Sequence, residues 1–139
     1  MSSVRQQINI SAGPRAVWRA FTSADGIASW LVDSARIEEK SGGRVVLDTE
    51  DDDGNAIQER GLFHVFRPTR AMEIAFDRKP DTPWAGSLIK IAIARDGDET
   101  RVVLVHSGNT ESFTDDDRRA QLDKEWRGAL RSLRGALEG

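Results

Sequence analysis

The sequence predicts an α+β fold in which a curved, seven-stranded antiparallel sheet wraps around one long C-terminal helix, with two short helices after the first strand. Two observations support this prediction. Residues 114–137 place apolar side chains at intervals of three and four, which is the spacing of one helical face. Upstream of them, short apolar segments alternate with Gly-Gly, Asp-Gly and Arg-Pro turns, which is typical of strands joined as hairpins.

The C-terminal helix is the longest predicted element. Thr114 is its expected N-cap, and Asp115 and Asp116 fall in the first turn, where the helix dipole favours negative charge. A stripe this long needs an apolar surface to lie on, and the strands upstream supply one. The residues of the stripe are Leu122, Trp126, Ala129, Leu130, Leu133 and Leu137.

The first third of the chain changes from strand to helix. Residues 4–10 alternate between apolar and polar side chains, as in a half-buried strand. Pro14, Val17 and Phe21 then indicate a short helix, and Ile27 and Trp30 indicate a second one. Six further strands are expected at residues 35–39, 44–50, 56–66, 71–77, 87–94 and 100–106, paired as a meander that largely follows the chain.

Composition narrows the class of protein. The 139 residues are expected to form one domain, residues 1–139, with a full hydrophobic core. The formal net charge of -3 leaves no broad basic face for nucleic acid. Cysteine is absent, which rules out disulfides and thiolate sites, and no apolar run is long enough to span a membrane. We expect a soluble, unprocessed, cytoplasmic protein.

Several motifs resemble those of one known superfamily. The segment from Ile8 to Thr22 includes Ser11-Ala12-Gly13-Pro14 and Val17-Trp18-x-Ala20, and a second helix follows that ends in Trp30. Gly61 in mid-strand and the segment from Val102 to Gly108 fit the same pattern. The chain therefore resembles the SRPBCC or START-like superfamily, and most closely the branch named after the homologue of the activator of the Hsp90 ATPase.

The resemblance implies a helix-grip fold and leaves several functions open, because one scaffold serves many activities. Our first hypothesis is the binding of a small hydrophobic or amphipathic ligand in a cavity between the sheet and the C-terminal helix. A chaperone-associated protein-interaction module, with self-association as a further possibility, is the second. The third is an enzyme of the polyketide cyclase or dehydratase type that uses His106 or His64 as acid or base.

A concave sheet that grips a helix leaves a mostly apolar pocket. Packing is the simpler interpretation for most of the aromatic side chains, and a structural role for both histidines, since a general base needs a reachable proton. Trp84, in the long loop 78–86, and Trp30 are the better candidates for the mouth of the cavity. The residues expected to line it are Trp30, His64, Met72, Phe76, Trp84, His106, Trp126 and Leu130.

Other chemistry has little support. The acidic segment 48–53 precedes Gly54 and can be compared with the calcium-binding loop of an EF-hand. When Gly54 is aligned with the invariant glycine of that loop, Thr49 falls at the first ligand position and Arg60 at the last, where a glutamate is required, so the match fails. Nucleophile-elbow and phosphate-loop motifs are absent, so no cofactor, metal or catalytic residue is expected. Glu59, Arg60 and Glu73 could project into the cavity as a buried polar set or lie on the outer face of the sheet. The outer face is the favoured interpretation, because an unpaired buried charge is unfavourable.

Overall fold

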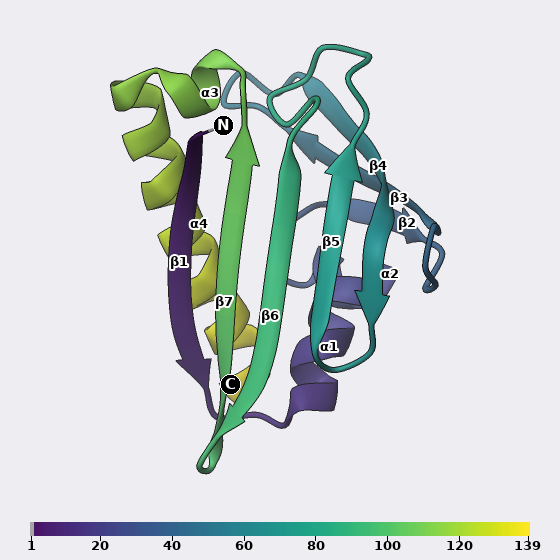
Figure 1. Ribbon diagram of the computed structural model, residues 1–139, viewed down its shortest axis with the longest axis vertical. Coiled ribbons are helices and arrows are strands. Elements are labelled where there is room, and N and C mark those ends of the chain that lie inside the picture. The colour runs from purple at the N-terminus through teal and green to yellow at the C-terminus, as the bar shows by residue number, and fades with distance from the viewer. Residues whose placement is uncertain (1) are drawn as a thin grey trace.

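The computed structural model describes residues 2–139 and has the expected α+β fold. Within these residues, seven strands form one antiparallel sheet in the order β1-β7-β6-β5-β4-β3-β2, and the helices lie on one side of it (Figure 1). The strands are β1 (Ser2–Ile10), β2 (Ser34–Ile37), β3 (Arg44–Glu50), β4 (Ala56–Arg67), β5 (Ala71–Phe76), β6 (Leu88–Asp96) and β7 (Glu99–Gly108). The helices are α1 (Pro14–Thr22), α2 (Ala24–Ala28), α3 (Glu111–Thr114) and α4 (Asp116–Glu138).

The predicted meander is confirmed for β2 to β7, which pair in chain order, and β1 closes the sheet beside β7. Turn glycines permit the tight connections. Gly42, Gly54 and Gly97 have φ angles of 75°, 82° and 63°, a region in which a side chain would be strained. They join β2 to β3, β3 to β4 and β6 to β7, at the positions where the sequence predicts turns.

The two short helices form where the sequence predicts them. Pro14 is the first residue of α1, and the hydroxyl of Ser23 accepts the Gly26 N–H at 2.9 Å to cap α2. Trp30 follows α2, and its indole N–H donates to the carbonyl of Ala20 at 2.8 Å while its ring packs edge-on against Phe21. This contact ties the end of α2 to α1.

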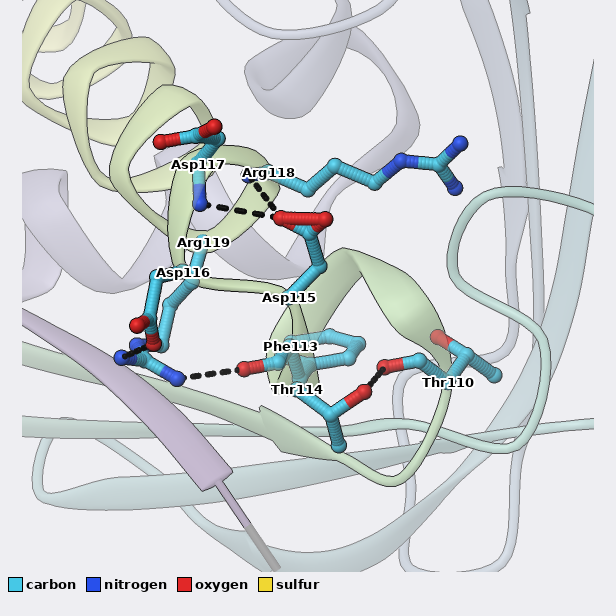
Figure 2. A network of polar contacts seen from close by, with 8 residues as sticks. All are labelled: Thr110, Phe113, Thr114, Asp115, Asp116, Asp117, Arg118 and Arg119. Atoms are coloured by element: carbon cyan, nitrogen blue, oxygen red, sulfur yellow. Dashed lines mark hydrogen bonds and ion pairs between the residues drawn. The ribbon is translucent and has the colours of Figure 1, made fainter.

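The start of the C-terminal helix differs from the prediction, because the helix is interrupted at Asp115. Residues up to Thr114 form the separate helix α3, and Asp115 rather than Thr114 caps α4 (Figure 2). The Asp115 carboxylate accepts the N–H groups of Asp117 and Arg118 at 3.0 and 3.3 Å, whereas the Thr114 hydroxyl donates back to Thr110. A carboxylate here also complements the helix dipole, which favours Asp115 as the cap.

The core lies between the concave face of the sheet and α4. Buried residues of α4 are spaced as the sequence predicts, and α4 packs along β1. Two members of the predicted stripe, Ala129 and Leu137, are only partly buried at its edge. The helix contributes Leu122, Trp126, Leu130 and Leu133 to a core that includes Met72, Ile74, Phe76, Ile89, Ile91, Ile93, Val102 and Leu104 from the sheet.

Candidate functional site

An aromatic cluster joins the β5–β6 loop, β7 and α4. Trp84 comes from the loop between β5 and β6, His106 from β7 and Trp126 from α4. The Trp84 ring stacks on Trp126 with 5.4 Å between centroids, and it meets His106 and Phe76 edge-on at 5.2 and 5.5 Å. Phe113 of α3 covers His106 from another side at 4.8 Å. Four of the predicted site residues are therefore brought together.

Hydrogen bonds connect this cluster in a defined direction. The indole N–H of Trp126 donates to Nδ1 of His106 at 3.1 Å, so Nδ1 is unprotonated and the ring proton sits on Nε2. The Nε2–H group then donates to the Ser87 hydroxyl at 2.8 Å, and that hydroxyl donates to the Trp84 carbonyl at 2.6 Å. One chain of three bonds thus runs from α4 through β7 to the loop that carries Trp84.

His106 is placed for structure rather than for proton transfer. Its side chain is fully buried, and both ring nitrogens already have protein partners. Burial lowers its pKa from 6.5 to about 3, because a charged imidazolium would lose its hydration. A neutral ring with no open face cannot take a proton from a ligand in this conformation.

His64 lies elsewhere, and its expected place in the cavity is wrong. Its side chain is 67% exposed and its ring contacts Glu73 at 3.3 Å on the outer face of the sheet. The pleat explains the difference, since the neighbouring Phe63 takes the inward position and a bulge follows between Phe63 and Val65.

The other predicted lining residues belong to the packed core or its rim. Met72 and Leu130 are each 1% exposed, and Phe76 packs against Trp84. Trp30 is partly buried beside Phe21. Of the predicted set, Trp84 and Trp126 line the hollow between the sheet and α4.

The open space is displaced from where the sequence places it. Between the sheet and α4, Trp84 and Trp126 leave a void of about 10 Å³, the size of a single water. On the far side of Trp84 lies a chamber of about 160 Å³. It is formed by β3, β4, the segment after α2 and the β5–β6 loop, with Leu31, Val32, Leu47, Thr49, Ile57, Glu59, Pro83 and Trp84 as its lining.

A wider groove adjoins this chamber. It has a volume of about 530 Å³ and shares Ile57, Pro83 and Trp84 with the chamber. Its other residues come from the β3–β4 hairpin and from α3 and α4, namely Glu50, Asp51, Asp52, Ser112, Arg118, Gln121, Leu122 and Glu125. Trp84 therefore stands between the groove, the chamber and the inner void.

Glu59 also departs from expectation, because it faces the chamber and not the outer surface. It is 4% exposed, and its carboxylate accepts the Thr82 hydroxyl and the Trp84 N–H, the latter at 3.0 Å. Burial raises the pKa of Glu59, although both hydrogen bonds act in the opposite direction. These bonds fasten the β5–β6 loop to β4 and so position Trp84 over the chamber.

The fold and its motifs coincide with one protein family. A family model described as Activator of Hsp90 ATPase homolog 1-like protein matches residues 11–138. The chain belongs to this family. A comparison with curated proteins finds no significant match. The predicted membership of the START-like superfamily is confirmed by this assignment.

Several solved structures share the architecture of this chain. The Aha1 dimer from Colwellia psychrerythraea is 22% identical with a TM-score of 0.79, over 99% of this chain and 97% of that chain. An AHSA1-like protein from Aeromonas hydrophila is 21% identical with a TM-score of 0.75, over 97% and 92%. CalU16 from Micromonospora echinospora is 18% identical with a TM-score of 0.74, over 97% and 75%. These likenesses establish the fold.

Two further findings concern the described part of this family member. Among residues 2–139, no group of three or more His, Asp or Glu side chains is arranged to hold a metal ion. No helix in the same range is both long and apolar enough to cross a membrane.

Two polar residues of the site are not predicted correctly: the outer face is favoured for Glu59, and Ser87 is not singled out. For Glu59 the sequence carries a usable signal. In β4, Ile57, Glu59, Gly61 and Phe63 share one face by simple alternation, and Ile57 and Phe63 are apolar. That pattern points Glu59 inward. Ser87 carried no such signal, because its role depends on the position of Trp84, which lies three residues earlier in an irregular loop.

Proposed function

We propose that this protein binds a small apolar or amphipathic molecule in the chamber beside Trp84. The observation that supports the proposal most directly is the size and lining of the chamber. Its 160 Å³ compares with the ~150 Å³ of an engineered apolar cavity that accepts benzene. Apolar side chains dominate its walls, and one carboxylate and one hydroxyl supply polarity, as is usual for ligand pockets.

The position of Trp84 adds a second argument. Its indole is partly exposed and separates the chamber from the inner void. Rotation of this one side chain away from Trp126 would join the two spaces and extend the site along α4. A ligand larger than one ring would then occupy the volume that the two stacked indoles now fill.

A titration with a neutral aromatic probe tests the proposal. We expect 2-phenylethanol to change the tryptophan fluorescence and to shift the amide resonances of Leu47, Ile57 and Trp84. Thr49→Phe, which fills the chamber from β3, should abolish these changes. Val46→Phe adds a ring on the opposite face of the same strand and should leave them intact. Equal responses of the two variants would contradict the proposal.

Catalysis by a histidine has little support beside this binding function. His106 is buried and neutral, and His64 lies on the outer face of the sheet. An enzyme of the cyclase or dehydratase type would need another acid or base near the chamber, and Glu59 is the ionisable residue that lines it. Unchanged turnover of an identified substrate by His106→Gln and His64→Gln would exclude histidine catalysis.

Self-association is a second proposal, and it concerns the sheet edges. The relative from Colwellia psychrerythraea is described as a dimer. In this chain β1 and β2 stand at the two ends of the sheet, and edge strands carry backbone groups that can pair with a second copy. Sedimentation velocity over a range of concentrations tests the proposal, and a monomer throughout would contradict it.

A chaperone-associated role is tested by stimulation of an Hsp90 ATPase.

A further inference from the structure

The chamber holds an acidic side chain that has no cationic partner within the described part of the chain. Glu59 is the one ionisable residue among those lining it, and Thr49 is the other polar one. The donors to the Glu59 carboxylate are a hydroxyl and a backbone N–H, both neutral. Among residues 2–139, none of the ion pairs involves Glu59. A cation that entered the chamber would meet a carboxylate that lacks a positive partner.

The energetics of Glu59 agree with a missing cation. A buried carboxylate is unfavourable unless it is paired, and for Glu59 the effect of burial exceeds that of its two hydrogen bonds. An ammonium group beside it would stabilise the ionised form. Each oxygen of the carboxylate accepts one hydrogen bond and can accept another, so the loop bonds and a ligand bond are compatible.

The groove that adjoins the chamber is also mostly acidic. Its walls carry the carboxylates of Glu50, Asp51, Asp52 and Glu125 against one cation, Arg118. Arg118 itself is paired with Glu111 at 2.9 Å. A groove with an excess of one sign of charge raises the local concentration of opposite ions and repels like ones. An amphipathic carboxylate would therefore be disfavoured at the mouth, and an amphipathic amine would be favoured.

We propose that the chamber selects a small hydrophobic amine, whose ammonium group pairs with Glu59 while its apolar part lies against Leu47, Ile57 and Trp84. This inference rests on the proposed binding function and specifies its ligand class. The size of the chamber limits the apolar part to about one aromatic ring, as with the benzene-sized cavity above.

Three probes of similar size and different charge test the inference: 2-phenylethylamine, 2-phenylethanol and phenylacetate. Calorimetric titration at neutral pH should show the amine binding about tenfold more tightly than the alcohol, as expected for a hydrogen bond to a charged group. Phenylacetate should bind more weakly than both. Equal affinities for the amine and the alcohol would overturn the inference and leave the binding function standing, whereas failure of all three probes to bind would overturn both.

Variants separate the charge of Glu59 from its structural role. Glu59→Gln should remove the preference for the amine over the alcohol. Thr82→Val loosens the same loop but keeps the carboxylate, so affinity for all three probes should fall together while the preference persists. Glu73→Gln removes a carboxylate from the opposite face of the sheet and should retain both affinity and preference. A preference for the amine that survives Glu59→Gln would overturn the role of Glu59.

Discussion

The indole nitrogen of Trp126 lies 3.1 Å from Nδ1 of His106, and the indole is the donor. Because an indole N–H can only donate, this contact determines which nitrogen of His106 carries the proton. It also links the long helix to the last strand through a polar bond inside an apolar core. The neutral state and the tautomer of His106 both follow from this contact and from burial.

The first prediction concerns the ring of His106. Its ¹⁵N resonances should show the Nε2–H tautomer and should not titrate between pH 8 and pH 5, because burial lowers the pKa to about 3. Long-range ¹H–¹⁵N spectra recorded over this range would check the tautomer and the pKa together. An imidazolium signal at pH 6, or a protonated Nδ1, would contradict the hydrogen-bond chain.

The same pKa predicts how stability depends on acid. Below pH 6.5 the unfolded chain binds a proton at this histidine and the folded protein does not, so the unfolded state gains stability as the pH falls. The contribution of His106 is complete above pH 6.5 and decreases by about 1.4 kcal/mol per pH unit toward pH 3. Urea denaturation of the natural protein and of His106→Gln at several pH values isolates this slope, because other titrating groups contribute equally to both proteins. A difference in unfolding free energy between the two that does not shift with pH between 6 and 4 would count against it.

The next prediction separates the hydrogen bond of Trp126 from its volume. Trp126→Phe removes the donor and leaves the buried Nδ1 of His106 without a partner, which costs about 1–3 kcal/mol. Trp18→Phe, in α1, changes the same volume at another buried tryptophan and is the matched control. The difference in unfolding free energy between the two variants should equal that penalty, and equal losses would mean that the bond contributes nothing.

Trp126→Ala tests whether Trp126 serves in packing or in ligand binding. If Trp126 serves only as core, the loss should reach about 3–5 kcal/mol, as for other large-to-alanine changes. Its 3% exposure and its stacking on Trp84 support that magnitude. A much smaller loss accompanied by a changed affinity for 2-phenylethanol would instead place the indole at the binding site.

Much of the fold could be predicted from local sequence patterns, because interactions between neighbouring residues determine where its strands, turns and helices form. The strand alternation, the glycine turns and the three-four spacing on α4 each depend on neighbouring residues, and the structure confirms them. The predicted N-cap of α4 is wrong by one residue. Thr114 and Asp115 are both good N-caps, and the choice depends on where α3 ends, which the packing of Phe113 beneath His106 influences.

The site was less accessible to sequence reasoning because it depends on a loop. The sequence identifies Trp84 as a candidate site residue. It does not predict that the ring of Trp84 fills the space between the sheet and α4. That position depends on the bond from the Trp84 N–H to Glu59, which joins residues far apart in the chain, and on the bond from Ser87 to the Trp84 carbonyl inside an irregular loop. The prediction for His64 is wrong for a different reason. Alternation along β4 assigns neighbouring residues to opposite faces, so the inward position of Phe63 places His64 on the outer face.

Two glycines give a prediction about the docking of α3. A methyl group at Gly108 would lie 2.6 Å from the ring of Phe113, so Gly108→Ala must displace that ring from His106. We expect a loss of about 1–3 kcal/mol, as for other overpacked positions. Gly128, inside α4, has open space around it, and Gly128→Ala should stabilise by about 0.5–1 kcal/mol. Thermal unfolding compares the two, and equal shifts would contradict the steric role of Gly108.

The last prediction concerns the pH dependence that Glu59 creates. Burial raises its pKa above 4.5, so the folded protein holds this proton more tightly than the unfolded chain does. Stability from this group is therefore present below pH 4.5 and is lost as the pH rises through the folded pKa, by up to about 1.4 kcal/mol per unit. Glu59→Gln lacks this loss. The unfolding free energy of the variant relative to the natural protein should thus increase with pH across that window and then level off.

Denaturation of both proteins in parallel measures this difference directly, and it cancels the contribution of His106, which both contain. Glu50→Gln, at the exposed end of β3, is the control, because it changes the net charge by the same amount as Glu59→Gln. Saturating 2-phenylethylamine should reduce the difference, because an ammonium beside the ionised Glu59 lowers the pKa that burial raises. A difference between the natural protein and Glu59→Gln that stays constant with pH would mean that this carboxylate titrates alike in the folded and unfolded states.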